Sequence, residues 1–598
     1  MSGTSNIKSE GLVTFSIKVE GTTIPDTVGV LSIHIDKAIN RIGTAKIVVI
    51  DGEPATGEFK VSSSSTFIPG NKVTIEAGYD RKNQTIFKGI VTQQSIEISG
   101  LGSKLIVECK DAAYQMIVGR KSLTYAKKTD SDIISSIIGT YSGLDSDVSS
   151  TTTEWPEQVQ YYVTDWDFII SRAESNGLIV NVIDGKVNVK APNADTSSVL
   201  TIAYGDNLYE FNANLNSITQ LESVKATAWS YKEQTIVNSE ASNDHAGAGN
   251  LSSKKLAEDV HNSNFELQTG APLEKEDLTN WSKAQLVKSE YSKIQGEAKF
   301  QGTALVNPGT YITLKGLGDR FNGDHFVSQV IHAIEGGNWM TETIIGIPSD
   351  WFIERPDVIA PSASGLLPGA RGLFNATVKK MYEDTDNQFR ILIDIPLFDA
   401  AGEGIWARLS NFYSTNGAGV FFLPEVGDEV IVGFINEDPR YPIILGSLYS
   451  DSKIKPFEGL EPDEKNSIKA IVSKSGINIQ FDDENKVLTL TTPGKNTAIL
   501  SDKDKQITIQ DQNSNSIVMS DSGIVMKSPK DISIEASQNL TLKGDQGVTI
   551  SSSGGDVQVD GINIKQSAQM EYSAEGSTTA QVQGGTELTL KGAMVMIN

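Results

Sequence analysis

The sequence predicts a mainly β protein: two hub β-barrels with a few helices, a small barrel of the OB type, and a C-terminal intertwined trimeric β-helix. Three observations predict this fold class. Apolar and polar residues alternate in short runs through the first 110 residues and again over 296–346. A second set of short strands follows a linker rich in Pro and Gly. From about Ile507, pairs of apolar residues separated by one residue recur toward the C-terminus.

The composition argues against several classes of function. A chain of 598 residues allows about three to five domains. Its net charge of −24 argues against nucleic-acid binding, because a phosphate backbone would be repelled. The single cysteine, Cys109, excludes a disulfide framework and a CxxC zinc site. We expect no cofactor and no metal. The polar N-terminus predicts no signal peptide. The chain has no apolar stretch of the length that a membrane span needs, so we expect no transmembrane helix.

The first 365 residues are predicted to form the hub domain with its two barrels. Turn signals separate strand-like runs of the first barrel at 14–20, 46–50, 72–76 and 104–108. Helices are expected at 129–138 and at 165–174, where Asp165 can act as the cap. The polar stretch at about 231–295 is predicted to be an insertion, with a long surface loop before a helix at 278–295.

Three segments follow the hub. Residues 366–450 contain about five strands and predict the OB-fold barrel. Residues 451–506 are interpreted as a linker and the start of a needle, and 507–598 as the β-helix needle itself.

The needle prediction rests on the period of the apolar pairs. Residues i and i+2 of a strand lie on one face, and so short a strand must stack on others to bury that face. Either one chain coils alone or three chains intertwine, and the uniformly short turns favour the trimer. The predicted interior comprises Ile517, Met519, Ile524, Met526, Ile532, Ile534, Leu540, Leu542, Val548, Ile550, Val557 and Val559. The pairs then continue at 562/564, 570/572, 580/582, 588/590 and 594/596.

The predicted OB barrel carries a motif with a specific order and spacing. It comprises Trp406, Arg408, Pro424, Gly427, Glu429, Asp438, Pro439, Pro442 and Gly446. This motif resembles the OB core of the VgrG family and of phage baseplate hub-spike proteins. The run from Asp165 to Leu178 resembles the hub signature of the same family, and the C-terminal repeats resemble its needle.

The resemblance implies a homotrimeric central spike of a contractile injection system: type VI secretion, an extracellular phage-like particle or a phage tail. Its implied partners are a hexameric inner-tube protein, a PAAR-type tip protein, baseplate proteins and effector cargo. Tip contacts are expected at Met594, Met596 and Asn598. The resemblance also implies assembly in the bacterial cytoplasm, export by the machine itself, and contact with the target membrane only by puncture.

Catalytic interpretations of individual residues are weaker than structural ones, and we expect that the protein is not an enzyme. Asp165 and Asp167 fit a helix cap with a solvated neighbour better than paired catalytic carboxylates. His325 and His332 fit a metal pair poorly. The OB motif is interpreted as structural, with Trp and Phe side chains in the barrel core. Two alternatives stay open: a trimeric tail fibre or adhesin, and a polysaccharide-degrading enzyme on a monomeric β-helix.

Overall fold

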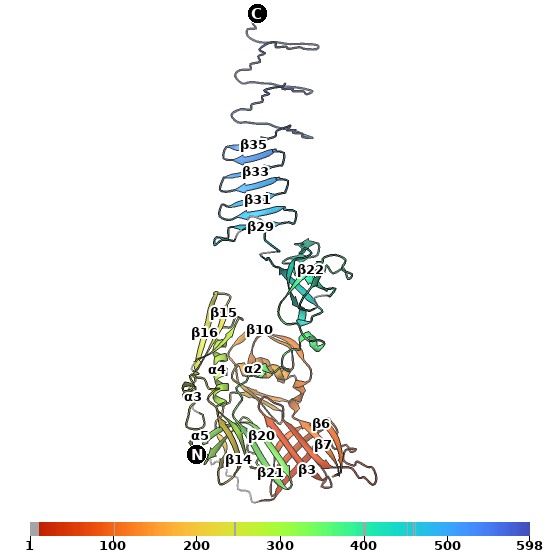
Figure 1. The fold of residues 1–598 in the computed structure, drawn as a ribbon, viewed down its shortest axis with the longest axis vertical. Coiled ribbons are helices and arrows are strands. Elements are labelled where there is room, and N and C mark those ends of the chain that lie inside the picture. The colour runs from red at the N-terminus through yellow and green to blue at the C-terminus, as the bar shows by residue number, and fades with distance from the viewer. Residues whose placement is uncertain are drawn as a thin grey trace. The chain divides into compact units, whose positions relative to one another are not determined.

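The architecture was obtained as a computed structural model, which describes residues 11–100, 102–243, 247–262, 264–398, 402–450, 453–457, 460 and 462–597. The chain divides into two units, 1–448 and 449–598. Strands dominate the described residues, which confirms the mainly β class (Figure 1). No helix among these residues is long and apolar enough to cross a membrane.

Thirteen strands of the hub form one hydrogen-bonded sheet in the described part of the chain. They are β1 Val13–Val19, β2 Thr22–Thr23, β3 Val30–Ala38, β4 Thr44–Ile50, β5 Lys72–Tyr79, β6 Lys82–Ser99, β7 Gly102–Lys110, β13 Ser198–Ala203, β14 Leu208–Leu215, β18 Ile294–Gln301, β19 Tyr311–Lys315, β20 Gly323–Glu335 and β21 Asn338–Ile345. Alternate residues of each strand face the core, as Ala45, Ile47 and Val49 do in β4.

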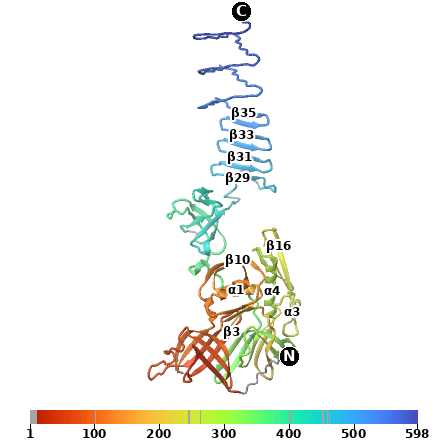
Figure 2. The ribbon, with the colours of Figure 1, turned by 180° about the vertical axis from the view of Figure 1, so that it is seen from behind.

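Antiparallel pairing of β3 with β20 joins the two strand-rich halves predicted from sequence, and Ile33 lies opposite Ile334. Figure 2 shows the red and orange strands of the first half beside the green strands of the second half. Each half keeps its own apolar cluster. One is built around Ile35, Ile47 and Phe87, and the other around Ile202, Phe300 and Ile312. The two halves therefore share one continuous sheet, and each packs its own core against it.

A helical layer lies between these halves in the sequence. It comprises η1 Ala112–Ile117, β8 Lys121–Thr129, α1 Asp130–Ile138, β9 Asp145–Val148, β10 Glu154–Val163, α2 Asp165–Ser175, β11 Ile179–Ile183 and β12 Lys186–Lys190. Both predicted helices are confirmed, but the cap of α2 is Thr164, whose side chain accepts the Asp167 amide. The prediction of Asp165 as the cap was wrong by one residue.

The polar insertion is more ordered than the sequence predicted. It forms β15 Ser223–Ser230, β16 Thr235–Ser242, α3 Ser253–Asp259, β17 Asn264–Thr269 and α4 Lys275–Tyr291. Small apolar residues explain this order: Val224, Ala226 and Ala228 of β15 are buried in clusters that include Leu278 and Leu286 of α4. The rest of the hub and the linker contain α5 Gly318–Phe321, η2 Phe352–Glu354 and η3 Ser362–Gly365.

The predicted OB barrel is present as a closed five-stranded barrel in the order β22-β23-β24-β28-β27. Its strands are β22 Phe374–Lys380, β23 Ile391–Asp394, β24 Ile405–Leu409, β27 Glu429–Phe434 and β28 Pro442–Ser447. The short hairpin β25 Ser414–Thr415 and β26 Ala418–Gly419, and the turn η4 Ile435–Glu437, complete it.

The second unit contains the needle, which has two parts. The first is an antiparallel meander that we call the needle sheet: β29 Ile468–Val472, β30 Asn478–Asp482, β31 Val487–Thr491, β32 Thr497–Ser501, β33 Gln506–Gln510, β34 Ser516–Ser520 and β35 Gly523–Lys527. The second, residues 528–597, we call the octad segment. It has no strand pairing, and bends recur along it about every eight residues, beginning at 529, 537 and 545.

Candidate functional site

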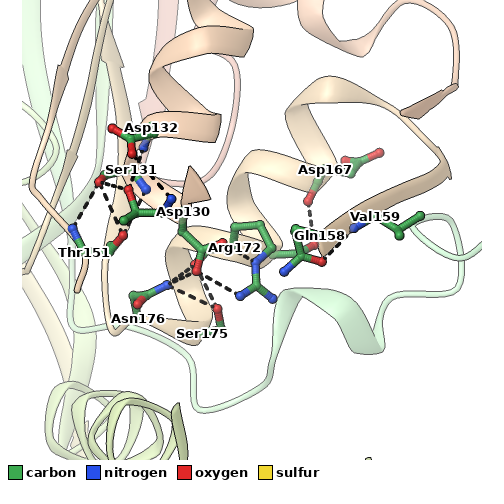
Figure 3. Close-up of polar contacts among 12 residues, drawn as sticks. Asp130, Ser131, Asp132, Thr151, Gln158, Val159, Asp167, Arg172, Ser175 and Asn176 are labelled. Atoms are coloured by element: carbon green, nitrogen blue, oxygen red, sulfur yellow. Dashed lines mark hydrogen bonds and ion pairs between the residues drawn. The ribbon is translucent and has the colours of Figure 1, made fainter. Parts of the chain in front are cut away.

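Helix α2, which contains the hub signature, ties several hub elements together. The buried carboxylate of Glu174 accepts a bond of 2.5 Å from Nζ of Lys288 in α4 and one of 2.7 Å from the Phe352 amide of η2. Arg172 donates two bonds, of 2.7 and 2.9 Å, to the Asp130 carboxylate of α1 (Figure 3). These partners are distant in sequence, and sequence analysis missed all of them.

Asp165 and Asp167 serve different structural roles. The carboxylate of Asp165 accepts Nζ of Lys121 at 2.6 Å, the Tyr141 hydroxyl at 2.5 Å and the Gln160 amide at 2.8 Å. Burial alone would raise the pKa of Asp165, but these three donors outweigh it and the pKa is lowered. Asp167 accepts instead from the capping Thr164 hydroxyl. The buried Asp165 therefore fastens the β8–β10 ribbon to α2, whereas Asp167 belongs to the N-terminal cap of α2.

The two histidines have separate surroundings. Nε2 of His325 lies 2.8 Å from the Phe321 carbonyl oxygen, and Nδ1 of His332 lies 3.0 Å from the Thr341 hydroxyl. Burial lowers the pKa of both. Among the residues that the structure describes, no three His, Cys, Asp or Glu side chains gather as a metal site would require.

The OB motif residues all lie in or beside the closed barrel, but the predicted core is partly wrong. Ala407 of β24 points inward and is fully buried, so its neighbour Trp406 faces outward, with the Arg390 guanidinium 5.8 Å from its ring centre. Phe421 and Phe422 are also exposed. The core consists of Ala376, Val378, Ile391, Ile393, Ile395, Ala407, Val430, Val432 and Ile444, with Phe374 and Phe434 packed at its edge.

The second half of the motif shapes two connections of the barrel. The Asp438 carboxylate accepts three bonds from Arg440, and this guanidinium lowers the pKa of Asp438. Pro442 opens β28, where a missing amide costs least, and Gly446 follows a register shift opposite Ile431. In the same barrel, Pro424 is buried, Arg408 and Pro439 lie nearer the surface, and Glu429 accepts from Asn375.

Gly427 has a backbone requirement that explains its residue type. It is the third residue of the turn from Glu425 to Asp428, which is closed by the Asp428 amide on the Glu425 carbonyl at 3.0 Å. Its φ of 96° lies in the region that favours glycine, as the third position of a type II turn does.

We expect Gly427→Ala to destabilise the barrel by about 1–2 kcal/mol, because a Cβ at positive φ meets its own backbone. Thermal unfolding followed by circular dichroism measures this change. Gly446→Ala is the matched control: both positions have open space around the added Cβ, but Gly446 has no positive φ. Equal effects of the two substitutions would show that the turn conformation is not the cause.

The needle sheet has one apolar face, which we call the inner face. Its register aligns two columns of side chains across the strands. One column is Ile471, Ile479, Leu490, Ala498, Ile509, Ile517 and Met526, and the other is Lys469, Phe481, Leu488, Leu500, Ile507, Met519 and Ile524. The columns begin well before Ile507, where sequence analysis placed the first pair. The earlier strands lie about ten residues apart rather than eight, so the octad period does not reveal them.

The predicted interior residues of the octad segment are exposed in the chain. Exposed fractions are 52% at Ile532 and 61% at Ile534, and 56% and 67% at Leu540 and Leu542. Each first inner residue lies two positions after the end of a bend, as Ile532 follows 530 and Leu540 follows 538. The remaining predicted pairs through Val557/Val559 have the same spacing from the preceding bend, and we call this spacing the frame of the needle.

The frame corrects three later pairs. Ile562 and Met570 lie in bends and are fully exposed, so the inner pairs become 564/566 and 572/574. At the end of the described needle, Val595 and Ile597 take the inner positions. The predicted tip contacts Met594 and Met596 are exposed by 79% and 82%, and Asn598 falls outside the described residues. Two shortened turns, at Gly561 and Gly592, cause the shifts.

Two family models match the chain. The Alg8 N-terminal domain matches residues 9–336, and the type VI secretion system/phage-baseplate injector OB domain matches residues 374–449. The second match covers the closed barrel and every residue of the OB motif.

Individual proteins show shorter or more distant likenesses. The chain is similar to the type VI secretion system spike protein VgrG1c of Pseudomonas aeruginosa, with 26% identity over 138 residues, which are 22% of this chain and 19% of that protein. It is also similar to the actin cross-linking toxin VgrG1 of Vibrio cholerae, with 32% identity over 81 residues, 13% of this chain and 7% of the toxin. The chain thus matches about a fifth or less of the length of these relatives.

Among solved structures, the chain is similar to the E. coli c3393 protein, a component of the type VI secretion system with structural similarity to the T4 bacteriophage tail proteins gp27 and gp5. The identity is 13% and the TM-score 0.35, over 72% of this chain and 99% of that one.

Proposed function

Because this chain belongs to the family of the Alg8 N-terminal domain and carries an injector OB domain, we propose that it is the trimeric central spike of a contractile injection system. The resemblance to VgrG and phage baseplate hub-spike proteins is confirmed, and it supports a structural role in a baseplate spike. The observation that carries the finer proposal is the uncovered inner face of the needle.

Three needle sheets can cover one another. Each sheet presents two columns on its inner face that are apolar apart from Lys469 in the first strand, while its other face carries mostly Thr, Ser, Gln and Asn. Packed as a triangular prism around one axis, three inner faces exclude water from all the columns. Each Ile, Leu or Met that becomes fully buried contributes about 1.5–3 kcal/mol before the entropy cost. A trimer therefore gives the needle sheet the core that one chain lacks.

The octad segment needs partners for its backbone as well. Within residues 528–597, all of which the structure describes, the extended runs between bends pair with no other strand that the structure describes. Backbone amides and carbonyls beside a buried core require hydrogen bonds. Two further copies supply them if the three chains wind around one axis, so that each face of the prism takes strands from all three. The closed prism has no free strand edge along its length.

The proposed work of the spike is mechanical. The hub sheet, with its two cores, would sit against the hexameric inner tube, and the OB barrels would form the collar between hub and needle. The prism would transmit the thrust of contraction to a PAAR-type tip, puncture the target envelope and deliver effectors. The OB motif then serves the collar and not catalysis, in keeping with the relatives named as spike proteins. The chain would assemble in the cytoplasm and leave by the machine it belongs to.

Direct binding tests the partners. We expect the full-length protein to retain both a PAAR-type tip protein and the tube protein encoded beside it. Met594→Asp with Met596→Asp should weaken tip binding, because charges replace the outward apolar side chains at the end of the needle, and should leave tube binding unchanged. The measurement is co-purification with each partner. Retention of neither partner by the unaltered protein would favour the tail-fibre alternative.

A further inference from the structure

Among the inner positions of the octad segment, one level is polar. Counting two positions from the bend at 562 places Ile564 and Gln566 on the inner face, and counting from the bend at 569–570 places Tyr572 and Ala574 there. The exposed fraction of Ile564, 53%, matches that of the first inner residues Ile532 and Val557, at 52% and 53%. This agreement supports the frame at the point where the sequence repeat is irregular.

Side-chain bonds on the opposite face confirm the alternation. The Gln558 amide donates to Asp560, the Gln581 amide to Gln583, and the Thr589 hydroxyl to Glu587. The partners in each bond are two residues apart and flank an inner residue of the same extended run, namely Val559, Val582 or Leu588. Polar residues joined in this way therefore mark the outer face both before and after the level of Gln566 and Tyr572.

The two inner polar residues contact each other. The Tyr572 hydroxyl donates to Oε1 of Gln566 at 2.7 Å, so side chains from successive octads meet on the inner face. In the frame given above, the other inner residues from Ile517 to Ile597 are apolar. The small residues Ala574 and Ala580 come next, which leaves space near the axis for a tyrosine ring from each chain.

We propose that, in the trimer on whose existence this inference rests, Gln566 and Tyr572 of the three chains form one polar layer across the needle axis that aligns the chains. Octads are nearly equivalent in shape, so aliphatic layers alone distinguish poorly between the correct alignment and one displaced by an octad. With this layer, a displaced chain would bury the Gln566 amide and the Tyr572 hydroxyl against aliphatic side chains without hydrogen bonds. Single polar residues in coiled-coil cores set register for the same reason.

The winding itself provides an assay of alignment. Each octad takes a chain to the next face of the prism, so a strand of one chain lies beside the strand one octad later of another chain. Outer residues 581 and 589 of neighbouring chains are then about 4.8 Å apart, within disulfide range. Gln581→Cys with Thr589→Cys should link all three chains covalently after mild oxidation. The native Cys109 does not interfere, because it is buried and burial raises its thiol pKa to about 12.

The test adds Gln566→Leu with Tyr572→Phe to this double-cysteine protein and measures covalent species on denaturing gels. We expect loss of covalent trimer and appearance of dimers linked between identical positions, while the mass in native buffer stays that of a trimer. Gln558→Leu is the control, an equal change on the outer face, and should keep the covalent trimer. If the layer variant cross-links as fully as its parent, the proposal is wrong.

Two further readouts separate the possible failures. If the quadruple variant does not assemble, Tyr572→Phe alone decides, because it keeps the ring and removes only the hydroxyl. A partial loss of covalent trimer supports the layer, and an unchanged yield overturns it. A monomeric mass of the double-cysteine parent would instead contradict the trimer, and with it the proposed function.

Discussion

We expect Ile534→Asp to abolish assembly of the trimer and leave the chain as a monomer near 64.5 kDa. Ile534 is 61% exposed in the single chain, so the substitution costs the isolated chain little. In the prism it places three carboxylates close to one axis without counter-charges. Burying an unpaired charge costs several kcal/mol, and the three copies repel one another. Light scattering coupled to size-exclusion chromatography measures the mass. A denaturing gel of heated samples measures whether the trimer resists dissociation by heat and detergent.

Ser533→Asp is the matched control for this effect. It adds the same charge one residue away, on the outer face, where water solvates it. The control should remain trimeric and heat-resistant. A full-length, heat-resistant trimer of Ile534→Asp would show that the inner face is assigned incorrectly.

The second large effect is expected at Glu174→Ala. The carboxylate of Glu174 and Nζ of Lys288 are both nearly inaccessible, with side-chain exposures of 9% and 7%. Removing the carboxylate leaves the buried Lys288 ammonium without a counter-charge, with the Asp350 carbonyl as its remaining acceptor, and leaves the Phe352 amide without its acceptor. Loss of one member of a buried pair destabilises proteins by about 3–5 kcal/mol. The urea concentration at the midpoint of hub unfolding should therefore fall. The fluorescence of Trp351 reports this unfolding, because Nζ of Lys288 lies 5.1 Å from the centre of the Trp351 ring.

Lys255→Ala provides the comparison for Glu174→Ala. Lys255 pairs with Asp259 within α3, but both side chains are more than half exposed. Water screens such a pair, so its loss should leave the urea midpoint unchanged. If Glu174→Ala also leaves the midpoint unchanged, the Glu174–Lys288 pair does not hold α2, α4 and η2 together.

Local patterns in the sequence predicted much of the fold. The alternation of apolar residues located strands such as β4, and capping residues located α1 and α2. The order of Pro424, Gly427 and Asp438 predicted the turns of the OB barrel, because each residue type answers a local backbone requirement. The i, i+2 pairs predicted one-sided apolar strands for the same reason.

The features that sequence analysis missed depend on contacts between residues that are distant along the chain. Nothing near Glu174 in the sequence identifies Lys288 as its partner, and nothing in the polar insertion shows that α4 covers β15 and β16. Trp406 was placed in the barrel core by residue type, whereas the inward position of Ala407 determines that it faces outward. The frame of the needle after Val559 changed because two turns, at Gly561 and Gly592, are one residue shorter than the octad repeat predicts.

The mass of the full-length protein in solution tests the central claim most directly. The inner face of the needle requires three chains, so light scattering on the purified protein should give three times the chain mass of 64.5 kDa, without dependence on concentration at micromolar levels. A mass near 64.5 kDa at these concentrations would contradict the trimeric spike, because one chain alone leaves both apolar columns in water.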